Sequence, residues 1–151
     1  MVFAKTSKCA SRLSKQVQNH VFKKIYYAVV MNKLPKKQDT LIDFLLKDEK
    51  TNTVKIDKSG KKSILDYELI EYKENMSLVK INLQTGRSHQ IRVQFSSRGY
   101  PLYGDHKYNP NVKRNSNIAL FAYSISFKHP TTQEQLTFSL DIPNKYPWNI
   151  F

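Results

Sequence analysis

The sequence predicts an α+β fold in which a mixed, mainly antiparallel sheet is flanked by two helices. Segments with alternating or β-branched residues recur along the chain, and short polar turns join most of them. Only two segments place apolar residues at helical spacing. Hydrophobic residues make up 40% of the 151 residues, enough to supply a core, so we expect residues 1–151 to form a single domain.

The first helix is expected to begin after Thr6 or Ser7, because either side chain can cap it. It should have about three turns, end near Asn19 and lie on the surface against a sheet. Its apolar side chains recur every four residues, at Cys9, Leu13 and Val17. The residues before it, Met1 to Lys5, read as a short strand-like run.

Strands are predicted where β-branched and aromatic residues gather or where apolar and polar residues alternate. The predicted strands are Lys23 to Met31, Ile64 to Tyr72, Leu78 to Leu83, Ile118 to Phe127 and Leu136 to Leu140. Glu74–Asn75 should form the turn between the second and the third of them.

Three segments are less regular. Between Asn32 and Lys62, lysine-rich residues surround a short apolar piece from Leu41 to Leu46, and we expect a hairpin-like excursion on the surface. A polar loop is expected from Pro110 to Asn117. The ending IPNKYPWNIF contains two prolines and is expected to be an extended tail.

The stretch from Leu83 to Tyr108, LQTGRSHQIRVQFSSRGYPLYGDHKY, concentrates the charged and hydrogen-bonding residues. The strand before it breaks at Gly86, which can adopt a positive φ and admit a close neighbour. Ser88 should cap a second helix, which Gly99 should end. Arg87 then stands near a helix N-terminus, a position that suits anions.

The charge of the chain indicates an anionic partner. The net charge is +13, from 25 lysines and arginines against 12 acidic residues, and the pI is about 9.8. Such a balance is typical of nucleic-acid binding, and aromatic residues at 12% can stack on unpaired bases. An anionic membrane surface, or a basic protein without a specific partner, is the alternative. No long basic amphipathic helix favours the membrane.

The single cysteine, Cys9, excludes an intramolecular disulfide and suits a reducing cytoplasm. No apolar run approaches the ~18 residues that span a bilayer. The first residues carry no signal-peptide pattern. We therefore expect a cytoplasmic protein without a membrane partner.

Two motifs, T-G-R-x-H-Q-I-R and G-x-P-L-x-G-D-x-x-Y, follow one another within residues 85–108. Together they resemble the RluA-type RNA pseudouridine synthases. A K-x-Y-x-A-x-V strand of that family matches at Lys24, Tyr26, Ala28 and Val30. A closing F-x-H-P segment matches at Phe127, His129 and Pro130. The resemblance covers nearly the whole chain and implies that it has the fold of the pseudouridine synthase catalytic domain.

The resemblance implies isomerisation of uridine to pseudouridine in ribosomal or transfer RNA, without a cofactor or metal. It implies that Arg87 pairs with a nucleophilic aspartate and that Tyr26 contacts the target base. Ile91, with His89, Gln90 and Arg92, would contribute to substrate binding. Without the motifs, Arg87 would read as a solvated or capping charge, His89 as a structural hydrogen-bonding residue and Arg92 as part of an ion pair.

Two geometric expectations follow. Tyr26 and Tyr27 are neighbours in a strand and must point to opposite faces of the sheet. If Tyr26 occupies the site, Tyr27 faces away from it. Arg87 and Tyr26 should then face one cavity.

The family's nucleophile lies in an H-R-L-D-x-x-T-S-G segment, which does not occur in these 151 residues. In the family a strand reading like V-F-A-K-T follows that segment, and this chain begins MVFAKT. We therefore expect an incomplete catalytic domain that is inactive alone, with the front half as a possible separate partner chain. The alternative is a non-catalytic RNA-binding remnant of the same fold.

Overall fold

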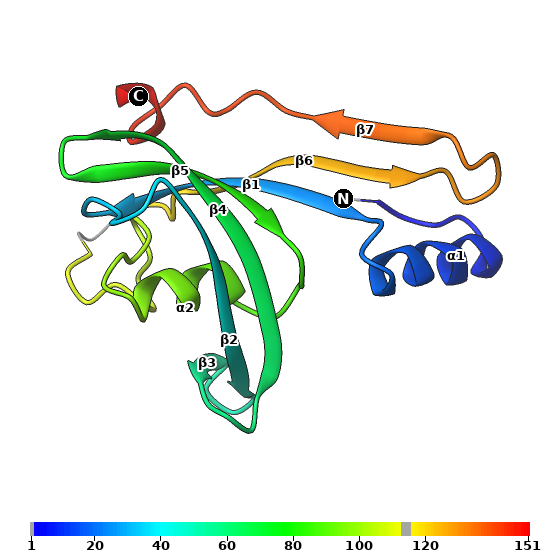
Figure 1. Ribbon diagram of the computed structural model, residues 1–151, viewed down its shortest axis with the longest axis horizontal. Helices are drawn as coiled ribbons and strands as arrows, with labels where there is room; N and C mark the ends of the chain where they lie inside the picture. Colours follow the sequence, from blue (N-terminus) through cyan, green and yellow to red (C-terminus); the bar gives the residue numbers. More distant parts are fainter. Residues whose placement is uncertain (1, 113–115) are drawn as a thin grey trace.

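A curved seven-stranded sheet forms the centre of the computed structural model, which describes residues 2–112 and 116–151 (Figure 1). The strand order is β3-β2-β4-β5-β1-β6-β7, and each pair of neighbours is antiparallel. The strands are β1 (Lys23–Met31), β2 (Gln38–Asp48), β3 (Thr53–Ile56), β4 (Lys61–Lys73), β5 (Met76–Leu83), β6 (Leu120–Lys128) and β7 (Gln135–Ser139). With the two helices, this sheet confirms the predicted α+β class.

The central strands β1 and β5 form where alternation predicted them. Ala28, Val29 and Val30 of β1 and Val79 and Ile81 of β5 are each buried. Glu74 and Asn75 both adopt positive φ angles in the tight turn between β4 and β5. The predicted turn at these two residues is therefore confirmed.

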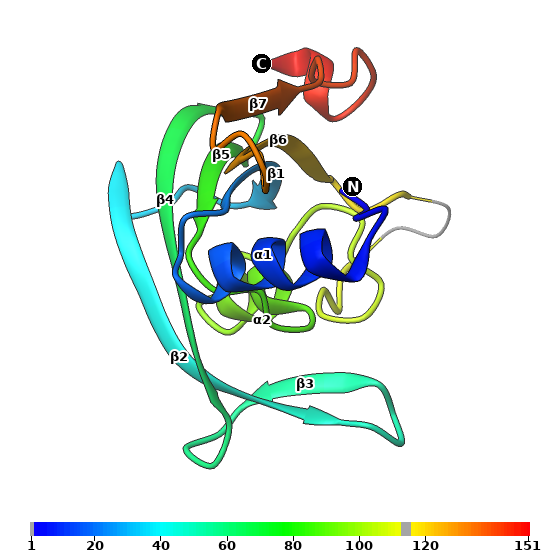
Figure 2. The same ribbon diagram turned by 90° about the vertical axis from the view of Figure 1, so that its right-hand side faces the viewer.

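Strand β2 is longer than the sequence suggested, and the expected surface excursion is part of the main sheet. Its polar first residues pair along β4, with Gln38 opposite Glu68 and Thr40 opposite Asp66. Such backbone pairing does not require apolar side chains, so the hydrophobic pattern revealed only the middle of the strand. The C-terminal end of β2, the N-terminal end of β4 and strand β3 together form an arm that curves below the helices (Figures 1 and 2).

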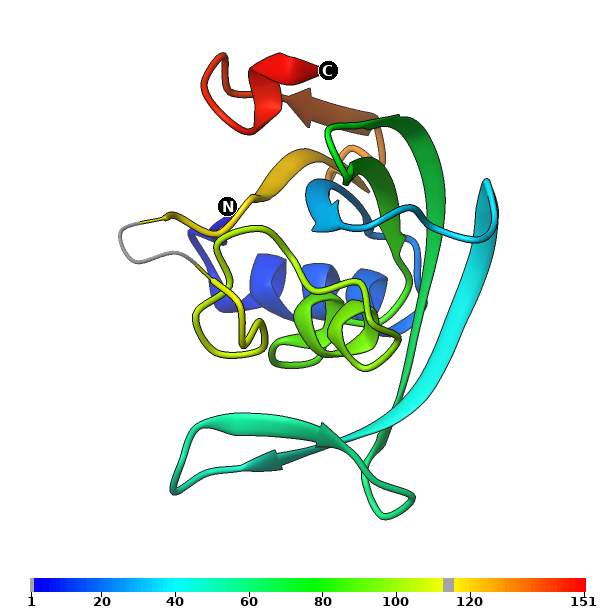
Figure 3. The same ribbon diagram turned by 90° about the vertical axis from the view of Figure 1, so that its left-hand side faces the viewer.

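Helices α1 (Ser7–Gln18) and α2 (Gln90–Ser96) lie on one face of the sheet, and the C-terminal segment lies across the other (Figures 2 and 3). The core on the helix side includes Ala28, Val30, Ile81, Ile91 and Phe95. The core on the opposite side includes Val29, Leu78 and Trp148. The alternating residues of β1 thus divide between two apolar layers.

Helix α1 rests on the surface, as predicted, and none of its residues is fully buried. The Thr6 side chain accepts a hydrogen bond from the Cys9 amide at 3.2 Å and caps the helix. Gln16 exchanges two hydrogen bonds with the backbone of Lys128, at 2.7 and 2.9 Å. Arg12 donates to the carbonyl of Pro130 at 2.8 Å. Side-chain hydrogen bonds therefore anchor α1 to the end of β6.

Both ends of the chain differ from expectation. Residues 2–5 form no strand, and Met1 lies outside the described residues. The tail folds back into a 3₁₀ turn, Trp148–Ile150, because burial of the Trp148 ring outweighs the extended preference of the prolines. Of the polar loop predicted from Pro110 to Asn117, residues 113–115 also lie outside the described part. No helix in the described ranges is long and apolar enough to cross a bilayer.

Candidate active site

The turn that carries Arg87 is fixed by the buried side chain of Gln90. The Gln90 carbonyl oxygen accepts from the Thr85 hydroxyl at 2.8 Å and from the Arg87 amide at 3.1 Å. Its amide nitrogen donates to the carbonyl of Ile64 in β4 at 3.1 Å. Gln90 is only 2% exposed, so it acts on the site by holding the turn rather than by facing a ligand.

Helix α2 begins at Gln90, and Ser88 does not cap it. His89 occupies the N-cap position in a left-handed conformation with φ 49°, and no side chain caps the helix. The imidazole shares a 2.7 Å hydrogen bond with the Tyr108 hydroxyl. Burial, followed by the positive charges of Arg92 and Lys107, lowers the pKa of His89. The neutral ring is therefore favoured, and its contacts are structural.

The predicted stop at Gly99 is confirmed. Gly99 has φ 83°, its amide donates to Ser96, and the next amide, of Tyr100, donates back to Phe95. These two bonds form a Schellman arrangement, which satisfies carbonyls at the helix end. Ile91 is buried with Phe95 in the helix-side core, so it supports the site from beneath.

Arg92 forms an ion pair with Asp105. Its guanidinium donates to both carboxylate oxygens, at 2.8 and 2.6 Å, and lies 4.9 Å from the centre of the Tyr108 ring. Asp105 also accepts from the amides of Lys107 and Tyr108. Burial alone would raise the pKa of Asp105, but Arg92 and these amides hold it below its ordinary value. This arrangement favours a structural role for Arg92 over substrate binding.

A groove of about 870 Å³ runs between α1, β1 and the β6–β7 pair. Its lining is mostly apolar and comprises Val2, Leu13, Phe22, Lys24, Tyr26, Ala122, Tyr123, Ser124, Ile125, Phe127, Phe138, Ser139 and Leu140. Tyr26 contributes to this lining, and burial raises the pKa of its phenol. Tyr27 instead packs against the core on the other face, as the alternation of β1 predicted.

Arg87 lies beside the groove and is not among its lining residues. Its side chain is exposed, and Nε donates weakly to the carbonyl of Lys62 at 3.4 Å. The preceding residue, Gly86, does border the groove, since a Cβ there would lie 3.0 Å from Nζ of Lys24. The expected cavity shared by Arg87 and Tyr26 is therefore not formed by this groove, although Lys24 links the two positions.

The conformation of Gly86 and its contact with Lys24 were not predicted from the sequence. Gly86 is not among the residues with positive φ, so its conformation does not demand glycine. Its one close neighbour from another segment is Nζ of Lys24, which lies at the tip of a flexible side chain. The signal for Lys24 was its position two residues before Tyr26, which places both side chains on one face of β1.

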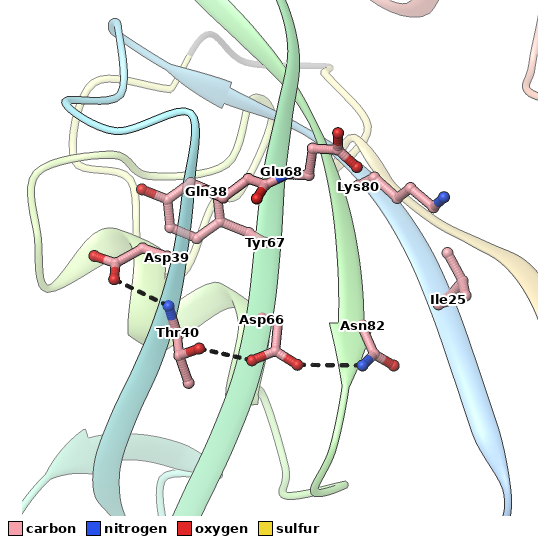
Figure 4. A pocket seen from close by; sticks show the side chains of 9 residues that line it. All are labelled: Ile25, Gln38, Asp39, Thr40, Asp66, Tyr67, Glu68, Lys80 and Asn82. Carbon is pink, nitrogen blue, oxygen red and sulfur yellow. Dashed lines mark hydrogen bonds between the residues drawn. The ribbon is translucent and has the colours of Figure 1, made fainter.

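No carboxylate of the described residues lines the groove. Asp66 faces a separate hollow on the opposite side of the sheet, where it accepts hydrogen bonds from Thr40 and Asn82 at 2.8 and 3.2 Å (Figure 4). Asp43 is bound by Arg98 at 2.9 Å and by Gln94. The described ranges also contain no group of three or more His, Cys, Asp or Glu side chains that could hold a metal ion.

Comparison with protein families identifies the class of protein that this fold and groove represent. A family model described as RNA pseudouridylate synthase matches residues 1–97. The chain belongs to the RNA pseudouridylate synthase family.

Among curated proteins, the uncharacterized RNA pseudouridine synthase YhcT of Bacillus subtilis is 32% identical over 146 residues, covering 95% of this chain and 48% of the relative. The ribosomal large subunit pseudouridine synthase D of Zymomonas mobilis is 31% identical over 156 residues, covering 95% and 49%. The chain thus spans about half the length of the curated relatives it matches.

Among solved structures, human RNA pseudouridylate synthase domain containing 1 superposes with a TM-score of 0.79 at 22% identity, covering 94% of this chain and 63% of that one. Human RNA pseudouridylate synthase domain containing 4 gives a TM-score of 0.78 at 17% identity. These two likenesses support the fold.

Proposed function

We propose that this chain supplies the uridine-binding part of an RNA pseudouridine synthase, acting on ribosomal or transfer RNA. The nucleophilic carboxylate then comes from residues outside these 151, in a front half that can be a separate chain. The observation that carries the proposal is the groove itself. It presents Tyr26 and borders the Gly86–Arg87 turn, and none of the described residues that line it carries a carboxylate.

Each proposed role follows from chemistry. A uridine must leave its base stack to reach the groove, where the Tyr26 ring can contact it. A phenol is protonated at neutral pH, and burial raises the pKa of Tyr26 further above its ordinary value, so its hydroxyl is a hydrogen-bond donor. The exposed guanidinium of Arg87 can bind an incoming carboxylate through two parallel hydrogen bonds, which holds that carboxylate ionised and aimed.

The reaction breaks the bond from C1′ to N1 of uridine and forms a bond from C1′ to C5; the C5 proton is lost to water and the released N1 takes up a proton, so the composition of the base is unchanged. No electrons are exchanged. Release of tritium from RNA labelled at C5 of uridine therefore measures turnover. The assay requires this chain together with a polypeptide that carries the H-R-L-D-x-x-T-S-G segment.

In that assay we expect Arg87→Ala to lower turnover by about a hundredfold or more, because it removes a charge that acts on the nucleophile. Tyr26→Leu should also lower turnover. Tyr27→Leu, a change in the neighbouring residue that faces the opposite core, is the matched control and should retain it. Equal turnover of the Tyr26 and Tyr27 variants would contradict the site.

A further inference from the structure

Lys24 is a half-buried lysine without a partner for its charge. It lines the groove next to Tyr26, and among the described residues its ammonium group has neither a hydrogen bond nor an ion pair. Burial lowers the pKa of Lys24, since removing an ammonium group from water disfavours its charged form. An unpaired charge held against a protein surface costs stability until an anion satisfies it.

The ammonium group of Lys24 lies next to Gly86. A Cβ at Gly86 would come within 3.0 Å of Lys24 Nζ, and no other heavy atom of another segment lies within 4 Å of that position. The glycine thus leaves room for the ammonium group at the end of the groove nearest Arg87.

The surroundings of Lys24 indicate the kind of anion. Phe22 stacks on Phe127 with ring centres 5.2 Å apart, and Phe127 stacks on Phe138 at 6.2 Å. Together with Tyr26, these rings give the groove an aromatic wall beside one cation. A flat apolar base joined to a phosphate matches that combination of surfaces.

We propose that Lys24 binds a backbone phosphate of the RNA strand whose base contacts Tyr26. This inference rests on the proposed function and adds a phosphate-binding residue to it. A phosphate at this point would satisfy the unpaired ammonium group, and the aromatic wall would shield the ion pair from water. Lys24 is then a binding residue for the substrate backbone and takes no part in bond breaking.

The test uses the 151-residue chain and single-stranded decauridylate as the probe, with affinity measured at several salt concentrations. We expect Lys24→Met to weaken binding and to reduce the slope of log affinity against log salt by about 0.7, the value for one lost phosphate contact on a single strand. Lys24→Arg should restore most of the affinity, because it keeps the charge. Gly86→Ala should weaken binding less than Lys24→Met, because Nζ lies at the tip of a flexible side chain and can shift slightly without losing its charge.

Lys145→Met is the matched control, since it removes an exposed lysine in the C-terminal segment, beyond the other face of the sheet. It should change affinity less than Lys24→Met. Thermal unfolding should show Lys24→Met at least as stable as the parent chain, because the variant removes an unpaired, half-buried charge. A variant that is both stable and weak in binding cannot be explained by misfolding.

The possible failures are distinguishable. If the parent chain binds the probe but Lys24→Met and Lys145→Met behave alike, the phosphate assignment is wrong while the RNA-binding function stands. If Lys24→Met binds RNA normally yet abolishes turnover in the reconstituted enzyme, Lys24 faces a protein carboxylate and the assignment is again wrong. If the parent chain does not bind the probe at low salt, both the inference and the proposed RNA binding are overturned.

Discussion

Arg92 and Asp105 join helix α2 to the loop that follows it. Asp105 is 1% exposed and accepts four hydrogen bonds, two from Arg92 and two from backbone amides. Tyr108, at the end of this loop, also connects the loop to the arm, because its hydroxyl accepts a hydrogen bond from the Val54 amide at 2.9 Å. One buried carboxylate thus helps to fix the helix, the loop and the arm around the site.

We expect Asp105→Asn to lower the free energy of unfolding by about 3 kcal/mol at pH 7, because it leaves Arg92 partly buried without its counter-charge. The folded-state pKa of Asp105 lies below its ordinary value, so its contribution is present at neutral pH and is lost as the pH falls below about 4. Denaturant unfolding at several pH values measures this. The exposed Asp141→Asn is the control. A difference between parent and Asp105→Asn that persists unchanged at pH 2 would contradict the charge pairing.

Gly104 and Gly99 have the same left-handed backbone conformation but different surroundings. Both have positive φ, 71° and 83°, but a Cβ at Gly104 would lie against the Asn117 backbone while one at Gly99 meets open space. Gly99→Ala should therefore cost only the left-handed strain, about 1–2 kcal/mol. Gly104→Ala should cost clearly more in thermal unfolding. Equal costs would show that the loop relaxes freely around residue 104.

At the level of single residues, the sequence was informative where strand periodicity or a backbone requirement for glycine determines the structure. The opposite faces of Tyr26 and Tyr27 follow from the pleat, and the end of α2 follows from Gly99. The role of Gln90 could not be predicted, because the bond that ties its turn to the sheet goes to the carbonyl of Ile64, which is distant in sequence. The partnerless state of Lys24 likewise depends on which neighbours surround it in space.

At the scale of elements, α1 is the helix held most loosely. Its contacts to β6 depend on side chains such as Gln16 and Arg12, and none of its residues is fully buried. Elements with few buried apolar contacts open at low free-energy cost. Leu13 of α1 lines the groove, so this part of the groove wall depends on the hydrogen bonds of Gln16 and Arg12.

We expect Gln16→Ala to speed amide hydrogen exchange in α1, by an amount equivalent to about 1 kcal/mol of local stability. Global unfolding should change little, because the helix contributes little to either core. Gln18→Ala, at an exposed position of the same helix, is the control. Identical exchange in the two variants would show that the hydrogen bonds to Lys128 do not anchor the helix.

The strands in the middle of the sheet were predictable because their apolar residues alternate with a clear period. The start of β2 was not, because its residues from Gln38 to Thr40 are polar and are ordered by pairing to β4. The C-terminal turn was missed for a related reason. Two prolines suggest extension locally, whereas burial of Trp148 is decided by the sheet face beneath it.

At the scale of the whole molecule, charge is the dominant property. A net charge of +13 on 151 residues favours contact with RNA phosphates at many points. We expect affinity for RNA to fall about a thousandfold between about 50 and 200 mM salt, if about six phosphates are contacted, with little sequence preference. Titrations with oligonucleotides of different sequence measure both properties. A flat salt response would rule out the electrostatic account.

We propose that this chain holds the uridine-binding groove and that the nucleophile is supplied by another polypeptide segment. The most direct test is tritium release from ribosomal and transfer RNA labelled at C5 of uridine. We predict no release by the 151-residue chain alone, because loss of a covalent nucleophile removes most of the chemical acceleration. We predict release once a polypeptide carrying the H-R-L-D-x-x-T-S-G segment is added. Turnover by the chain alone would show that one of its own residues replaces that aspartate, and would contradict this account.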